Sequence, residues 1–144
     1  KSARLCLAYG PGTKKNDKRV LNQFIEKAII LNSIKMNDEG AALRSYIYVA
    51  DATRMLLNIL FFGKKPTYNV GGEEKISIYN LAKKIAKILR VPVSTKKTTY
   101  SKGIGAPKNA FVNISLYKKE FKNYNFIKLD EGLKKTIEWQ KKIY

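Results

Sequence analysis

An arginine that precedes a tyrosine-rich run is the residue in this chain best suited to holding a phosphate. Arg44 leads into an aromatic and β-branched run that contains Tyr46 and Tyr48 and ends at Asp51. A guanidinium can hold a phosphate through two parallel hydrogen bonds, so Arg44 at the start of a strand could bind a nucleotide diphosphate. A surface arginine beside half-buried tyrosines would give the same pattern. The flanking sequence is needed to distinguish a phosphate-binding arginine from an ordinary surface arginine.

A second pair has the spacing of a catalytic dyad. Tyr79 and Lys83 form a Tyr-x-x-x-Lys pattern, in which a tyrosinate can act as a base and a lysine lowers its pKa. No Gly-x-x-Gly-x-x-Gly turn between a strand and a helix precedes this pair, so we interpret it as a surface pair. Gly71–Gly72 could bind an anion before a helix, but Glu73 and Glu74 would repel it. We therefore predict neither a catalytic residue nor a cofactor site in this chain.

The rarest residue types exclude several classes of protein. The chain has no histidine and one cysteine. Histidine-based triads, histidine-ligated zinc and disulfide frameworks are excluded, and we expect no metal. No apolar run reaches the ~18 residues of a membrane span, and no signal-peptide layout is present, which predicts a cytoplasmic protein without a membrane partner. The chain opens on Lys-Ser-Ala and runs at once into an apolar stretch, which we interpret as a fragment of a longer enzyme.

The charge balance raises a rival interpretation. Lys and Arg number 29 against 11 Asp and Glu, a formal net charge of +18. Such a charge attracts nucleic acid or phosphorylated metabolites, and the nine tyrosines could stack on bases, so a small basic nucleic-acid-binding module is one alternative. A non-catalytic interaction module is another. Because the excess is almost all lysine, spread along the chain without a nucleic-acid-binding motif, we do not expect nucleic acid as the partner.

The elements that must position these residues alternate between strands and helices. This order predicts one α/β domain over residues 1–144 with short strands and about five helices. Asp17 and Asp51 are expected to cap the first two helices and Ser77 the third. The expected strands cover 3–8, 34–36, 45–49, 67–70 and 92–95; the expected helices cover 19–31, 52–62, 78–91, 114–121 and 129–142; the expected loops include 71–76 and 96–110.

Five motifs follow one another in the chain, at 4–12, 17–25, 43–51, 68–72 and 77–82, and two more segments stand at 105–107 and 129–137. In this order they resemble the C-terminal half of NAD-dependent sugar-nucleotide epimerases and dehydratases, which are extended short-chain dehydrogenase/reductases. The resemblance is closest to the UDP-glucuronate decarboxylase and dTDP-glucose 4,6-dehydratase branch, and it is best over residues 3–93.

The resemblance implies a division of labour. In the family, the first half holds the Rossmann fold, the NAD site and the catalytic dyad, none of which is found here. This chain would then be the sugar-nucleotide-binding domain of an enzyme that acts on a UDP-, dTDP- or CDP-sugar by hydride transfer followed by epimerisation, elimination or decarboxylation. The parent would be a homodimer that uses NAD, and this fragment alone would be inactive. The implied substrate-binding residues are Arg44 at the diphosphate, Tyr46 after it, Arg19, Val20 and Phe24 beside the nucleotide, and Lys108 in the late loop.

Two positions depart from the family pattern. Leu7 stands where relatives often carry an asparagine near the diphosphate, and a leucine side chain cannot form a hydrogen bond. Lys108 stands where relatives often carry a second phosphate-binding arginine, and an ammonium supplies charge without the bidentate fork. We also expect the strands at 3–8 and 67–70 to be poorly partnered edges of an absent sheet, able to pair between copies.

Overall fold

The computed structural model describes residues 1–96, 107–122 and 125–144. Strands and helices alternate along most of this part of the chain, which confirms the predicted α/β class. The described helices are α1 Val20–Leu31, α2 Val49–Phe62, α3 Ile78–Leu89, α4 Ser115–Glu120 and α5 Leu129–Gln140. The strands are β1 Ser2–Leu5, β2 Leu7–Tyr9, β3 Ile34–Met36, β4 Leu43–Tyr48, β5 Thr67–Val70, β6 Lys75–Ser77, β7 Val93–Thr95 and β8 Asn109–Ala110.

The helix starts follow the expected capping in one case only. Ser77 caps α3, because its hydroxyl accepts a hydrogen bond from the Asn80 amide at 3.1 Å. The prediction that Asp51 caps α2 is wrong: the helix already begins at Val49, and the buried Asp51 carboxylate instead accepts a hydrogen bond from the Ile127 amide at 2.9 Å. Asp51 therefore ties the first turn of α2 to the segment that leads into α5.

Strand β4 is the central element of the molecule. Its second half pairs in parallel with β2, Tyr46 opposite Leu7, and its first half pairs antiparallel with β6 and in parallel with β8. The sequence analysis expected loops at 71–76 and 96–110. This expectation is wrong for β6 and β8, which are strands paired with β4. A strand of two or three residues is too short to show an alternating pattern. The Gly105–Ala106 part of the late-loop match lies outside the described residues.

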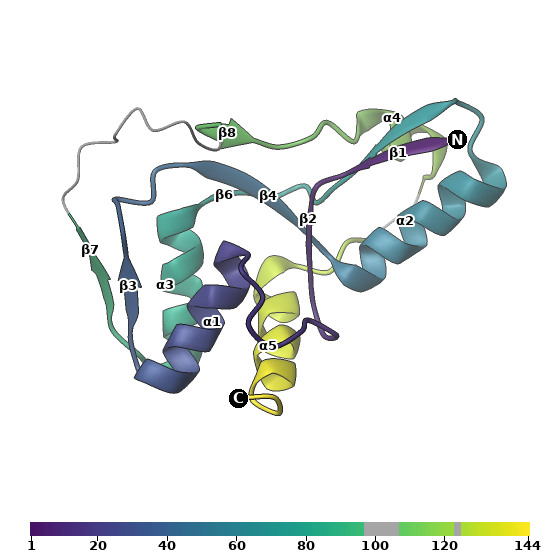
Figure 1. Cartoon of the computed structure of the whole chain (residues 1–144). Helices are drawn as coiled ribbons and strands as arrows, with labels where there is room; N and C mark the ends of the chain where they lie inside the picture. Colours follow the sequence, from purple (N-terminus) through teal and green to yellow (C-terminus); the bar gives the residue numbers. More distant parts are fainter. Residues whose placement is uncertain (97–106, 123–124) are drawn as a thin grey trace.

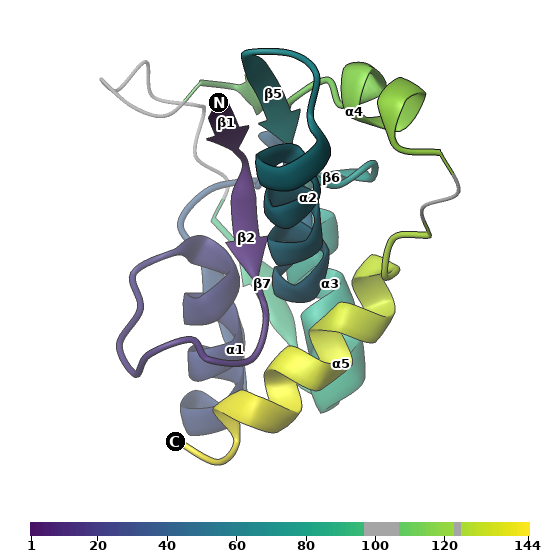
Figure 2. The same cartoon turned by 90° about the vertical axis from the view of Figure 1, so that its right-hand side faces the viewer.

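Two hydrophobic cores lie on the two sides of β4. Tyr46 and Tyr48 point into a core formed with α1, α3 and α5, whereas Ile47 points into a second core with α2, α4 and β5. Alternate side chains of a strand face opposite sides, which is why a single strand serves both cores. Figure 1 shows β4 crossing between the two groups of helices, and Figure 2 shows α5 running diagonally past the ends of α1 and α3.

Strands β1 and β5 form a separate two-stranded sheet. They pair in parallel with each other, from Ser2 opposite Thr67 to Leu5 opposite Val70. The sequence predicted that both strands are poorly partnered edges; within the described residues each has the other as its one partner strand, and all four residues of β1 are exposed. The extended segment of residues 2–9 changes partner at Cys6, from β5 before it to β4 after it. Among the described residues, no helix has the length and hydropathy to cross a membrane.

Candidate functional site

Arg44 lies where three strands of the central sheet meet. It stands opposite Ile76 of β6 on one side and Ala110 of β8 on the other. Its Nη1 donates to the carbonyl oxygen of Leu43 at 2.7 Å and to that of Lys108 at 3.2 Å. These bonds hold the half-buried guanidinium by one nitrogen. The edge formed by Nε and Nη2 makes no hydrogen bond to the residues that the structure describes, and this edge is the one that can grip a phosphate with two bonds.

Lys108 approaches Arg44 through its backbone. The Lys108 carbonyl accepts hydrogen bonds from the Leu43 amide at 3.0 Å and from Arg44 Nη1. Its side chain is exposed at the start of β8. The structure thus brings the backbone of Lys108 to Arg44, two of the three cations that the family resemblance selected, although 64 positions separate them in the sequence.

Tyr46 is part of the first core, the one formed with α1, α3 and α5. Its ring meets the ring of Tyr9 edge to face, with centroids 6.2 Å apart. Burial raises the pKa of Tyr46 to about 12, so its hydroxyl is protonated at neutral pH and can donate a hydrogen bond but cannot serve as a base. Both tyrosines also line a cavity of about 210 Å³ together with Tyr48, Asp51 and the Gly72–Glu74 turn.

Of the two apolar α1 residues that the resemblance selects, one is at the surface and one is in the core. Val20, the first residue of the helix, is 40% exposed, whereas Phe24 is 7% exposed and belongs to the first core. The structure therefore leaves Val20 available to a ligand. Phe24 mainly packs inside the protein.

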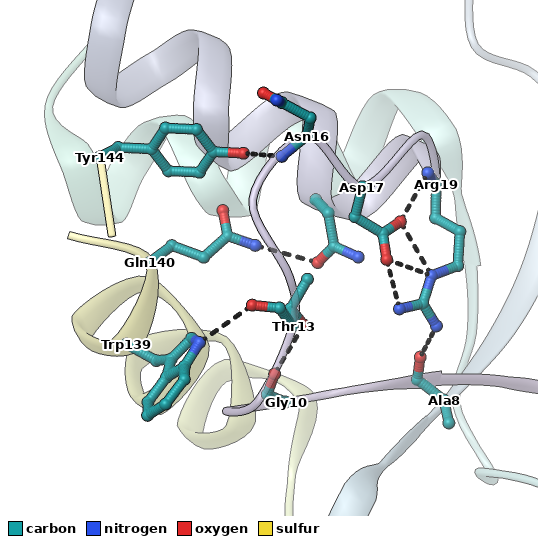
Figure 3. Close-up of polar contacts among 10 residues, drawn as sticks. Ala8, Gly10, Thr13, Asn16, Asp17, Arg19, Trp139, Gln140 and Tyr144 are labelled. Carbon is teal, nitrogen blue, oxygen red and sulfur yellow. Dashed lines mark hydrogen bonds and ion pairs between the residues drawn. The ribbon is translucent and has the colours of Figure 1, made fainter. Parts of the chain in front are cut away.

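Arg19 is held by its own neighbour in the sequence. Its Nε and Nη2 donate to both carboxylate oxygens of Asp17 at 2.7 to 3.1 Å, and its Nη1 donates to the Ala8 carbonyl at 3.0 Å (Figure 3). The hydrogen bonds from Arg19 hold the pKa of Asp17 well below its usual range. This interaction also corrects the sequence expectation for the helix start, because Asp17 binds Arg19 and makes no capping bond to the amides of α1. The bidentate edge of Arg19 is thus occupied.

The loop that carries Asp17 is attached to the C-terminal helix. Figure 3 shows Trp139 Nε1 donating to the Thr13 carbonyl, 3.1 Å away, and the Tyr144 hydroxyl accepting from the Asn16 amide, 2.7 Å away. Gln140 adds a buried bond to Asn22 of α1. Arg19 therefore belongs to a region built from contacts between this loop and the C-terminal helix.

One further cavity escaped the sequence analysis. It has a volume of about 380 Å³, and its lining includes Ser45, Lys75, Asn113, Ser115 and Lys118. Both lysines make contacts: Lys118 pairs with Glu73, and Lys75 Nζ lies 3.9 Å from the centre of the Phe111 ring. No sequence motif predicts this cavity, because its residues come from segments that lie far apart in the sequence.

The other candidates stay outside the site. Lys83 Nζ lies 4.8 Å from the centre of the Tyr79 ring, a cation–π contact on the surface of α3. In the part of the chain that the structure covers, no three His, Cys, Asp or Glu side chains gather as a metal site would require.

Comparison with known protein families finds one match at the start of the chain. Residues 1–71 match the NAD dependent epimerase/dehydratase family. A dTDP-4-dehydro-6-deoxy-D-allose reductase from Streptomyces sp. is 32% identical over 133 residues, which are 91% of this chain and 40% of the reductase. UDP-glucuronic acid decarboxylase 6 from Arabidopsis thaliana is 26% identical over 65% of the chain and 27% of the enzyme. The chain spans less than half the length of either relative.

Solved structures share the fold over nearly the whole chain. The dTDP-glucose 4,6-dehydratase of Bacillus anthracis, in complex with NAD, has a TM-score of 0.82 at 19% identity and covers 97% of this chain, which covers 44% of it. The UDP-glucuronic acid 4-epimerase of Bacillus cereus, in complex with UDP-glucuronic acid and NAD, has a TM-score of 0.81 at 22% identity over 99% of this chain and 45% of the epimerase.

Proposed function

Because the chain is homologous to the NAD dependent epimerase/dehydratase family, we propose that it is the substrate-binding part of an NAD-dependent nucleotide-sugar epimerase, dehydratase or decarboxylase. The ligand is a UDP-, dTDP- or CDP-sugar. Arg44 grips the diphosphate, Lys108 adds positive charge beside it, and Val20 lies against the nucleotide. The chain binds the substrate and orients it. Such binding lowers the barrier of the parent enzyme's reaction by holding the reacting groups in place.

The observation that carries the proposal is the one-sided anchoring of Arg44. The two carbonyls of Leu43 and Lys108 fix Nη1, so the guanidinium is held in one orientation before a ligand arrives. A group that is already ordered loses less entropy on binding than a mobile surface side chain. Arg44 therefore combines a fixed position with a bidentate edge that no described residue occupies, a combination suited to diphosphate recognition.

Neither the hydride step nor the NAD site is assigned to this chain. NAD binding by a Rossmann unit needs a glycine-rich turn between a strand and a helix N-terminus, and the sequence contains no such turn. Tyr46, the tyrosine that the family resemblance places at the substrate, is protonated at neutral pH because burial raises its pKa to about 12. We therefore expect the chain alone, supplied with NAD and a nucleotide sugar, to show no turnover. NADH formation by the wild-type chain would contradict this expectation.

A titration tests the binding proposal. The chain is titrated with UDP, dTDP, CDP and a short random DNA duplex at low and at physiological salt, beside the variants Arg44→Ala and Arg4→Ala. One nucleoside diphosphate should bind at physiological salt, and Arg44→Ala should lose about 1.5 to 3 kcal/mol of binding free energy, as expected for hydrogen bonds to a charged group. The exposed Arg4 on β1 is the matched control and should change little. Binding of DNA alone, with a steep salt dependence and no effect of Arg44, would favour the nucleic-acid-binding alternative.

A further inference from the structure

The face of β4 opposite Arg44 carries a buried hydroxyl without a strong hydrogen-bond partner. Ser45 stands between Arg44 and Tyr46 on β4, so its side chain points away from theirs and toward the second core. Ser45 is 1% exposed, and its Oγ has no nitrogen or oxygen partner among the described residues. The Cys6 thiol beside it is a weak hydrogen-bonding group. Buried polar groups normally have a partner, so this hydroxyl calls for an explanation.

Ser45 lines the cavity of about 380 Å³ described above. This volume falls within the range of ~300 to 1,000 Å³ that is typical of small-molecule pockets. Hydrogen bonds fix part of its wall: the Asn69 side chain donates to the Asn113 carbonyl at 2.8 Å, and the Asn113 side chain accepts from the Ser115 amide at 2.8 Å. Figure 1 shows β8 and α4 along the upper side of the molecule and α1, α3 and α5 in its lower part. The cavity and Arg44 therefore lie on opposite faces of β4.

The charged side chains of the cavity favour an anion. Its lining holds two cations, Lys75 and Lys118, and one carboxylate, Glu73, which leaves one positive charge in excess. Within the described part of the chain, Lys75 makes no ion pair, and its ammonium lies 3.9 Å from the centre of the Phe111 ring. Lys118 pairs with Glu73, but both side chains are about half exposed, and such a pair contributes little stability. An anionic ligand could therefore replace Glu73 at Lys118.

Apolar side chains complete the lining. Val112 and Ile114 belong to it, and so does Phe111, which is 44% exposed. An inorganic ion would leave these side chains uncovered. An organic anion would cover them and gain the free energy of removing apolar surface from water. The cavity therefore suits a ligand that has both a charged and an apolar part.

We propose that this cavity binds a small organic anion, a carboxylate or a phosphate joined to an apolar group. Lys75 and Lys118 hold the anionic group, and the Ser45 hydroxyl donates a hydrogen bond to one of the oxygen atoms of the ligand. The apolar group lies against Val112 and Ile114. The ligand thus gives the buried hydroxyl a hydrogen-bond partner. This site does not depend on the proposed function.

The test uses phenyl phosphate and benzoate as anionic probes and benzylamine as a cationic probe with the same ring. Each probe is titrated into the full 144-residue chain at physiological salt, and NMR follows the amides of Gly72, Asn113 and Ser115. We expect saturable shifts of these amides with an anionic probe and none with benzylamine. Inorganic phosphate, which has no apolar group, should bind about threefold or more weakly than the tighter anionic probe.

Four variants separate binding from folding. Lys75→Met removes a cation and should lower probe affinity about threefold or more. Glu73→Gln should raise the affinity, because the probe no longer competes with a carboxylate for Lys118. Ser45→Ala should lower the affinity without lowering the free energy of unfolding, since the removed hydroxyl has no strong partner to lose. Lys119→Met is the matched control and should change little, because Lys119 is exposed on α4 but does not line the cavity.

Four results would overturn the inference. They are no saturable binding of either anionic probe, equal binding of benzylamine, an equal loss of affinity for Lys75→Met and Lys119→Met, and loss of probe binding in Arg44→Ala. The nucleotide titration separates this inference from the proposed function. Lys75→Met should keep nucleoside diphosphate binding and lose affinity for the probe, whereas Arg44→Ala should show the reverse, so either failure is recognised by its own readout.

Discussion

Arg44 and Arg19 carry the same guanidinium, and the fold uses them in opposite ways. Arg44 is anchored by Nη1 alone, on two backbone carbonyls, and its remaining edge makes no hydrogen bond within the described part of the chain. In Arg19, Nε and Nη2 donate to the Asp17 carboxylate, and Nη1 donates to the Ala8 carbonyl. We infer that Arg44 can offer a phosphate two parallel hydrogen bonds, whereas Arg19 would first have to release Asp17.

After the full truncation Arg44→Ala, the largest expected effect comes from keeping the charge of Arg44 and removing its two-pronged donor geometry. Arg44→Lys retains a cation but cannot donate two parallel hydrogen bonds, so we expect nucleoside diphosphate affinity to fall about tenfold, since each 1.4 kcal/mol corresponds to a factor of ten. Calorimetry against the preferred diphosphate measures the change. An affinity equal to that of the wild type would show that Arg44 acts only through its charge.

A smaller effect is expected at Lys108. Lys108→Ala removes an exposed charge and keeps the carbonyl that holds Arg44, so affinity should fall roughly two- to fivefold, in line with ~0.5 to 1 kcal/mol for a surface charge interaction. The same titration at high salt should shrink the difference, because salt screens exposed charges. A loss as large as that of Arg44→Ala would mean that Lys108 binds the phosphate directly.

Arg19 should matter to folding more than to binding. Arg19→Ala breaks a half-exposed ion pair and one bond to β2, so the free energy of unfolding should fall by about 1 kcal/mol or less. Diphosphate affinity should stay within about threefold of wild type, because the bidentate edge of Arg19 is already hydrogen-bonded to Asp17. Urea unfolding and the diphosphate titration together distinguish the two roles.

The smallest expected effect depends on pH. Because the pKa of Asp17 is lower in the folded state, its ion pair stabilises the protein above the ordinary value of 3.8, and that contribution is lost as pH falls through the folded value. Asp17→Asn should therefore lower stability at pH 7 by a few tenths of a kcal/mol, about the size of an exposed pair, and the gap should close only well below pH 4. Urea unfolding of both proteins from pH 7 to pH 3 would detect it. A gap already closed at pH 5 would contradict the assigned ion pair.

The sequence could predict the fold class and the elements with clear periodicity. The α/β fold is confirmed by the structure and shared with the solved neighbours, and Ser77 caps its helix as expected. Strand β8 could not be predicted, because two residues show no period, yet this strand brings Lys108 to Arg44. The Asp17–Arg19 pair was equally hidden, since an aspartate before a helix has the signature of a cap whether or not it binds a side chain.

The most direct measurement is a side-by-side titration of Arg44→Ala and Arg19→Ala with the preferred nucleoside diphosphate at physiological salt. The account predicts that Arg44→Ala loses at least tenfold in affinity, while Arg19→Ala stays close to the wild type, because of these two arginines Arg44 is the one whose bidentate edge makes no hydrogen bond to a described residue. Equal losses for the two variants, or a larger loss for Arg19→Ala, would contradict the assignment of the diphosphate to Arg44.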